Sequence, residues 1–148
     1  MLKNVRNKWL LTCSLLVFAI ADASASGDAV SSFHVGVLHP NGMDFLGYSV
    51  EKHMDNRLYW YYTIGVPSFL AIGITHYNNR DGNGLTATFG AGLGYTFYAA
   101  IAYQVKLGKK HFLKLGAAGT IATYYPFAPI EKSYYVERTG IIAYEYRF

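Results

Sequence analysis

The chain has 148 residues, enough for one ordinary domain, and carries a formal charge of +4. Hydrophobic residues make up 52% and charged residues 15%, which excludes charge-rich disorder. The single cysteine, Cys13, excludes a disulfide framework and a cysteine-built metal site. Three of the thirteen Lys and Arg residues lie in the first eight positions, so the charge predicts no nucleic-acid partner.

Residues 1–25 have the layout of a signal peptide. Three basic residues precede the apolar run 9–21, which is shorter than the ~20 residues that a membrane-spanning helix needs. Small residues then stand at the −3 and −1 positions that signal peptidase requires. The sequence therefore predicts cleavage between Ala25 and Ser26, followed by one exported domain over 26–148. A retained membrane anchor is the alternative.

From residue 30 onward, apolar residues fall on every second position, which is the period of a β-strand. Turn signals separate these runs, and all four prolines lie in the separators, as a hydrogen-bonded ladder requires. The alternation over 85–105 is too long for one typical strand, so we divide it near residues 92–94. The pattern predicts eight strands, at 32–39, 44–52, 57–65, 68–77, 84–92, 95–107, 111–124 and 133–148.

The two faces of these strands differ in an unusual way. One face is large and apolar, whereas the opposite face is mostly Gly, Ala, Ser or Thr. A soluble barrel would expose Lys and Glu, so we expect the small face to line a narrow lumen and the apolar face to contact lipid. Most charges in the strands share the parity of the small face and are predicted to line the lumen: Glu51, Arg57, Lys106, Lys114, Glu137, Glu145 and Arg147. Arg138 has the other parity, and its place near a strand end would let it reach the interface.

Aromatic residues gather near both ends of the predicted strands, as they do at bilayer–water boundaries. One set comprises Tyr59, Trp60, Tyr77, Tyr103, Tyr146 and Phe148, and the other comprises Tyr95, Phe97, Tyr124, Tyr125, Tyr134 and Tyr135. The alternative is that aromatics are simply common in strands. Taken with the inverted polarity, the pattern predicts an all-β fold, a closed antiparallel up-and-down transmembrane β-barrel of eight strands.

The last residues of the chain form the alternation Ile142, Tyr144, Tyr146 and Phe148, with Phe at the end. This ending resembles the C-terminal assembly signal of Gram-negative outer-membrane barrels. Its final three residues are similar to the last strand of the small OmpX/Ail-type proteins. The resemblance implies a location in the cell outer membrane, in contact with its lipid. Those proteins carry several long outward loops, whereas the one sizeable outward loop here is 124–132.

The sequence contains no phosphate loop, metal-ligand cluster or nucleophile elbow, so it predicts no metal and no cofactor. We expect a non-catalytic barrel with a structural or surface-interaction role. An extracellular partner would meet the 124–132 loop, which combines aromatic anchors with two stiffening prolines. The candidate contact residues in that loop are Tyr124, Tyr125, Phe127, Glu131 and Lys132.

Two alternative functions stay open. His39, Asp44 and Ser68 are expected near the outer rim, where such residues can form a base, an acid and a nucleophile. That set would suit a lipid A acyltransferase or deacylase. The second alternative is a soluble periplasmic β-barrel that binds an apolar ligand.

Overall fold

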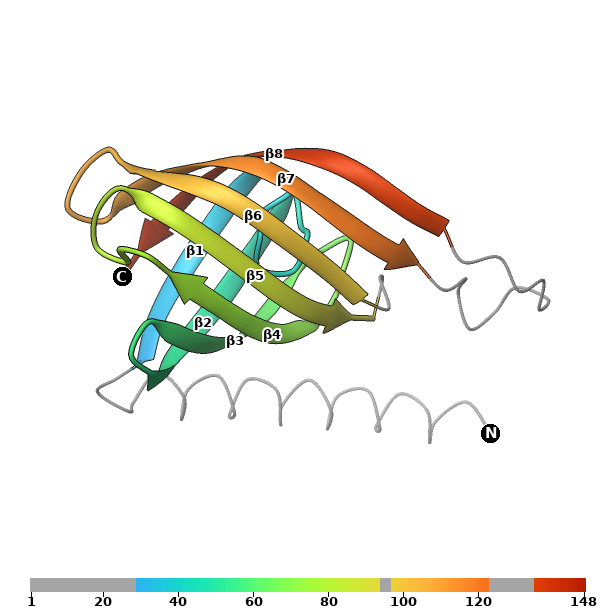
Figure 1. Ribbon diagram of the computed structural model, residues 1–148, viewed down its shortest axis with the longest axis horizontal. Coiled ribbons are helices and arrows are strands. Elements are labelled where there is room, and N and C mark those ends of the chain that lie inside the picture. The colour runs from blue at the N-terminus through green and yellow to red at the C-terminus, as the bar shows by residue number, and fades with distance from the viewer. Residues whose placement is uncertain (1–28, 94–96, 123–134) are drawn as a thin grey trace, which may run out of the picture.

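The computed structural model describes residues 29–93, 97–122 and 135–148. They form eight strands (Figure 1): β1 (Ala29–Val37), β2 (Leu46–Asp55), β3 (Leu58–Val66), β4 (Ala71–Tyr77), β5 (Gly84–Gly92), β6 (Phe97–Lys106), β7 (His111–Ala122) and β8 (Tyr135–Arg147). The predicted division near residues 92–94 is confirmed, because β5 ends and β6 begins on either side of it. The predicted signal peptide, 1–25, lies outside the described residues.

The strands form one closed barrel. Each strand pairs antiparallel with its neighbour in the chain, and β1 pairs with β8 to complete the circle. This closing seam runs from Ser32, opposite Arg147, to Val37, opposite Ile142. Closure removes every unpaired strand edge. The predicted closed antiparallel barrel of eight strands is therefore confirmed.

The two ends of the barrel differ in their connections. The segments that follow β1, β3, β5 and β7 leave one end, which we call the loop end. The connections after β2, β4 and β6 lie at the opposite end, which we call the turn end, together with the C-terminus (Figure 1).

The barrel wall is apolar outside and polar inside, as the alternation of the strands predicts. Large apolar side chains on the outer face are exposed; the exposed fraction is 63% for Ile101 and 58% for Ile142. The inward positions are small or polar and buried, and even Lys114 has an exposed fraction of 0%. Because successive side chains of a strand point to opposite faces, this inverted polarity follows directly from the period of two.

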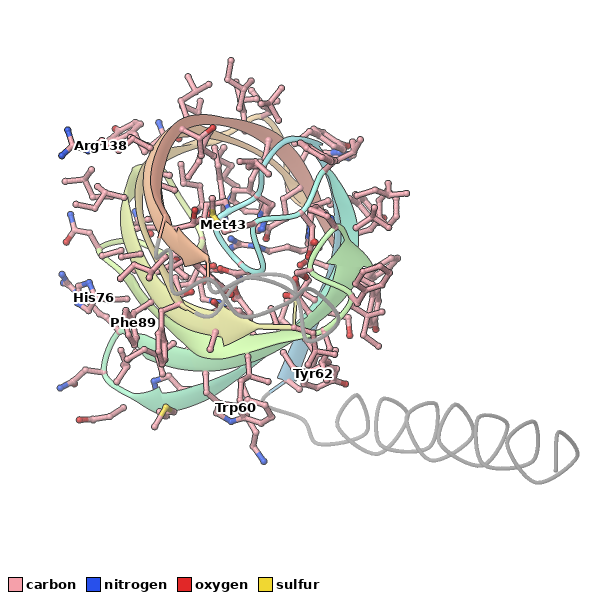
Figure 2. The ribbon with its side chains drawn as sticks, turned by 90° about the vertical axis from the view of Figure 1, so that its right-hand side faces the viewer. Met43, Trp60, Tyr62, His76, Phe89 and Arg138 are labelled. Carbon is pink, nitrogen blue, oxygen red and sulfur yellow. The ribbon has the colours of Figure 1, made fainter. Side chains whose placement is uncertain are left out.

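Strand boundaries depart from the prediction at the loop end. β1 ends at Val37 rather than at 39, and β2 begins at Leu46 rather than at 44, because the segment between them turns into the barrel. Figure 2 shows its Met43 within the ring of strands. β4 begins at Ala71 rather than at 68, because the chain first makes a turn in which the backbone N–H of Phe69 donates to the carbonyl of Gly65 over 2.9 Å.

The aromatic residues near the turn end form ring contacts. Phe148 packs edge-on against Tyr146 at 5.2 Å between ring centroids and lies 6.4 Å from Tyr48. The interpretation of Tyr77 as a boundary residue is wrong, because its side chain points into the lumen and is 1% exposed. Tyr77 has the inward parity of β4, whose Ile72 and Ile74 point outward.

Candidate functional site

A buried loop, residues 38–44, enters the barrel interior from the loop end. We call it the inner loop. All seven residues are buried, although they belong to a connection between strands. The backbone N–H of His39 donates to the carbonyl of Asp44 over 2.8 Å, and that of Met43 donates to the carbonyl of His39 over 3.0 Å. These hydrogen bonds pair some of the loop's backbone N–H and C=O groups. Burying such groups unpaired would be costly. The loop therefore fills the lumen as an ordered part of the fold.

The small residues of the inner wall make room for this loop. A Cβ placed on Gly65 of β3 would lie 2.5 Å from a carboxylate oxygen of Asp44, and a larger side chain there would displace the loop. Two non-glycine residues of the loop, Leu38 and Met43, have a positive φ of 57°. Such backbone conformations cost on the order of 1–3 kcal/mol each and persist only where the surroundings enforce them. Hydrogen bonds between the barrel and His39, Asn41 and Asp44 of the loop hold it in this conformation.

Glu145 of β8 is the centre of one cluster beneath the inner loop. It is 1% exposed. One of its oxygens, Oε2, lies 2.8 Å from His39 Nε2 of the inner loop and 2.6 Å from Lys114 Nζ of β7. Its other oxygen accepts a hydrogen bond from Arg147 Nε. The two buried cations thus share a single carboxylate, which also holds the inner loop.

Glu51 of β2 is the centre of a second cluster. Its Oε1 accepts hydrogen bonds from Asn41 Nδ2 of the inner loop at 2.6 Å and from the Tyr77 hydroxyl at 2.5 Å. Its Oε2 lies 3.1 Å from a guanidinium nitrogen of Arg80, which belongs to the connection between β4 and β5. Glu51 therefore binds a segment from each end of the barrel.

Arg147 and Gln104 connect this turn-end segment to the rest of the interior. Gln104 Nε2 donates to the carbonyl of Arg80 over 2.8 Å, and Gln104 Oε1 accepts from an Arg147 guanidinium nitrogen over 2.6 Å. A second guanidinium nitrogen of Arg147 donates to the same Arg80 carbonyl over 2.6 Å. Because Arg147 also pairs with Glu145, the two carboxylate clusters form one continuous network.

The candidate catalytic residues His39, Asp44 and Ser68 all lie at the loop end, each 0% exposed. The backbone N–H and the hydroxyl of Ser68 both donate to the Asp44 carboxylate, each over 2.7 Å. Burial raises the pKa of Asp44, against the opposing effect of these two hydrogen bonds. The structure thus brings Ser68 and Asp44 together, with the Asp44 carboxylate accepting the hydrogen bond of the Ser68 hydroxyl directly.

His39 does not join them as a base. Its Nε2 faces Glu145, and its Nδ1 accepts a hydrogen bond from the backbone N–H of Asn41 over 3.2 Å. Burial lowers the pKa of His39, and the Lys114 cation adds to this effect, whereas the bond to Glu145 opposes it. A nucleophile must be bonded to its base. Both ring nitrogens of His39 have other partners, so neither is available to Ser68. His39 instead holds the inner loop in place through its contact with Glu145.

Four of the seven predicted lumen charges lie inside the barrel, namely Glu51, Lys114, Glu145 and Arg147. The prediction is wrong for Arg57 and Lys106, which are exposed at the turn end. Arg57 donates to Asn78 over 2.7 Å, and Lys106 donates to the carbonyl of Asp81 over 2.7 Å. Parity gives the face of a residue but not its depth: Arg57 lies in the connection between β2 and β3, and Lys106 is the last residue of β6.

The remaining predicted site residues fall outside the described part of the chain. This applies to the side chain of Glu137 and to the whole partner-binding candidate loop: Tyr124, Tyr125, Phe127, Glu131 and Lys132.

Sequence reasoning missed several interior residues. Tyr61 and Tyr98 meet through their hydroxyls at 2.5 Å, and the Tyr98 hydroxyl accepts the backbone N–H of Gly42 over 2.9 Å. His34 stacks on His39 with ring centroids 4.0 Å apart. The inward parity of Tyr61, Tyr98 and His34 was the available signal. For Asn41 none existed, because its sequence context indicates only an ordinary turn.

Comparison with protein-family models, curated proteins and solved structures finds no match to this chain. Among the described residues, no helix has the length and apolarity needed to cross a membrane. The same residues contain no group of three or more His, Cys, Asp or Glu side chains placed to hold a metal ion.

Proposed function

We propose that this protein is a small β-barrel of the Gram-negative outer membrane, with a structural or surface-interaction role and no catalysis. The observation that carries the proposal is the inverted polarity of the wall. Exposed Val, Ile, Leu and Phe side chains cover the outside, whereas the charged strand residues that are buried lie inside. Water-soluble monomers rarely expose contiguous apolar surface of this kind, whereas lipid-facing barrel walls require it.

The filled interior supports a closed barrel rather than a pore. Eight strands enclose a lumen that side chains can fill. Here the inner loop occupies the lumen from the loop end and Arg80 enters it from the turn end, both bonded to Glu51. Ions or solutes crossing the barrel would have to displace this hydrogen-bonded network.

The interior also favours this proposal over the two alternatives. A soluble barrel that binds an apolar ligand needs an apolar lumen with free space, whereas this lumen contains paired charges. A lipid A-modifying enzyme of the Ser–His–Asp type needs the serine bonded to a histidine, whereas Ser68 is bonded to Asp44.

We propose that surface contacts are made by the 124–132 loop. Replacing that loop by a short Gly/Ser turn tests whether a partner is lost.

Membrane fractionation and detergent dependence test the proposed location. We expect the protein in the outer-membrane fraction, soluble only with detergent, and migrating on gels at different positions before and after boiling. In planar bilayers we expect no single-channel current from the purified protein. Recovery as a monodisperse protein in detergent-free buffer would overturn the membrane location, and reproducible current steps would overturn the closed interior.

A further inference from the structure

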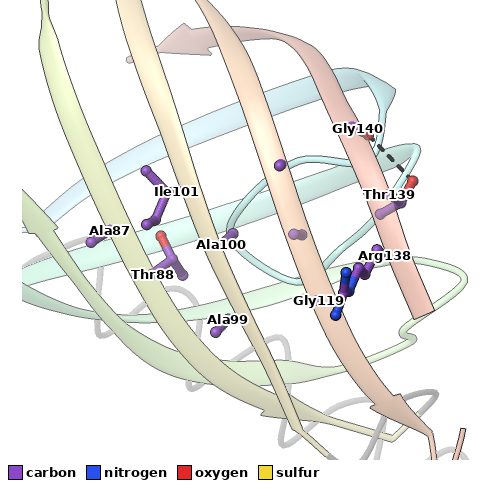
Figure 3. A pocket seen from close by; sticks show the side chains of 11 residues that line it. Ala87, Thr88, Ala99, Ala100, Ile101, Gly119, Arg138, Thr139 and Gly140 are labelled. Atoms are coloured by element: carbon purple, nitrogen blue, oxygen red, sulfur yellow. Dashed lines mark hydrogen bonds between the residues drawn. The ribbon is translucent and has the colours of Figure 1, made fainter. Parts of the chain in front are cut away.

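The outer wall formed by β5, β6, β7 and β8 contains a hollow of about 750 Å³ (Figure 3). Its floor consists of small outward residues on four adjacent strands: Ala87, Ala99, Ala117, Gly119 and Gly140. Larger side chains stand around it. The row nearer the loop end contains Phe97 and Ile121, and the row nearer the turn end contains Tyr103 and Leu115.

The register of the strands creates this hollow. Ala87 pairs with Ile101, Ile101 with Ala117, and Ala117 with Gly140, so three of the four residues in this outward row are small. In the next outward row toward the loop end, Ala99 and Gly119 continue the floor. The space is open, because a Cβ built on Gly140 would lie 4.0 Å from the nearest atom beyond its chain neighbours, the Gly116 carbonyl oxygen.

Arg138 stands at the edge of the hollow that faces the loop end. It pairs with Gly119, is exposed, and extends away from the wall (Figures 2 and 3). It makes no side-chain hydrogen bond or ion pair with the described residues. A charge on a lipid-facing wall is costly and marks a functional position, and a long Arg side chain can reach the headgroup region.

We propose that this hollow binds one molecule of the phosphorylated glycolipid of the outer leaflet, lipid A. The inference rests on the proposed membrane location. An acyl chain would lie on the small-residue floor, and a phosphate would meet the Arg138 guanidinium, whose fork of donors matches phosphate geometry. The volume lies within the range of about 300–1,000 Å³ of small-molecule sites.

Charge favours a lipid over a second copy of the chain in this hollow. A symmetric dimer brings the same surface of each copy together. Centred on the hollow, it would place two Arg138 cations in one apolar interface, where like charges repel and desolvation is costly. An anionic lipid instead supplies the missing counter-charge.

Native mass spectrometry of the full chain in non-ionic detergent, titrated with lipid A, tests the proposal. We expect one bound lipid A per barrel, and about tenfold weaker binding in Arg138→Gln, the loss expected for one charge-assisted hydrogen-bonded contact. Gly140→Leu fills the hollow from the wall and should weaken binding to a similar degree. Lys52→Gln, which removes an outward cation at the turn end, and Ala91→Leu, which enlarges an outward residue outside the hollow, are the matched controls and should bind as the native protein does.

Each other outcome would overturn the inference. Equal binding by the native protein and Arg138→Gln excludes the phosphate contact, and unchanged binding by Gly140→Leu excludes the chain site. Equal or tighter binding of phosphatidylcholine or phosphatidylglycerol excludes lipid A as the occupant, and a dimer without lipid assigns the hollow to a second copy. All variants are first checked for the shift in gel migration on boiling, and Ala117→Val replaces Gly140→Leu if the latter does not fold. A protein that needs no detergent contradicts the membrane location itself, whereas a detergent-dependent protein without bound lipid contradicts this inference alone.

Discussion

Replacing Glu145 by Gln tests whether the interior network holds the barrel together. The native carboxylate is buried and accepts contacts from His39, Lys114 and Arg147. Gln has the same shape but no charge, so Lys114 and Arg147, which are 0% and 6% exposed, lose their shared counter-ion. Removing one partner of a buried ion pair typically costs about 3–5 kcal/mol. We expect a decrease of that size in the free energy of unfolding.

The assay is equilibrium unfolding by urea in lipid vesicles, followed by the fluorescence of Trp60. Arg57→Gln removes an exposed cation and serves as the control, with an expected change within about 0.5 kcal/mol. The double variant Lys114→Met, Glu145→Gln should lose less free energy of unfolding than the sum of the two single variants, by about 0.5–3 kcal/mol, because it no longer contains an unpaired Lys114 cation. A cost below about 1 kcal/mol for Glu145→Gln, or strict additivity with Lys114→Met, would refute the reasoning.

Three further predictions concern the terminal residue, the wall and the inner loop. Deleting Phe148 removes its backbone hydrogen bond to the carbonyl of Ser31 and an aromatic contact at the turn end, so the fraction showing altered gel migration on boiling should fall. Leu115→Arg and Ile101→Arg should each lower the free energy of unfolding in vesicles by about 2–4 kcal/mol if these residues face mid-bilayer. Burial raises the pKa of Asp44 above its ordinary 3.8, so the stability that protonated Asp44 contributes is present at low pH and lost as the pH rises through the raised value. In Asp44→Asn, the free energy of unfolding measured across that pH range should not show this decline.

Controls and contrary results are specific to each of these predictions. Unchanged gel migration without Phe148 would contradict its role in assembly. On a water-facing wall the two arginine substitutions would change stability by no more than about 0.5 kcal/mol, which would contradict the lipid contact. Thr88→Arg overpacks the lumen and should destabilise the barrel in either setting, so it controls for general damage. If the free energy of unfolding still declines as the pH rises in Asp44→Asn, the decline comes from other groups.

The sequence by itself determined the strands and the side to which most of their residues point. The two-residue period depends only on neighbours along the chain. The alternation that ends in Tyr144, Tyr146 and Phe148 therefore predicts which side chains share a face without knowledge of any tertiary contact. Turn-forming residues between the runs then separated all eight strands. The preference for small residues on one face also predicted a crowded lumen, although not what fills it.

Only the tertiary structure decided what fills the lumen and which charges meet there. Pro40, Asn41 and Gly42 indicate a turn, but whether that turn projects outward or inward depends on the space left by glycines on other strands. His39 meets Glu145 across 106 positions of sequence, and parity cannot foresee such a pairing. The hollow beside Arg138 likewise exists because the register of four strands aligns their small residues. Periodicity fixes the direction of a side chain, whereas closure and register fix its depth and its neighbours.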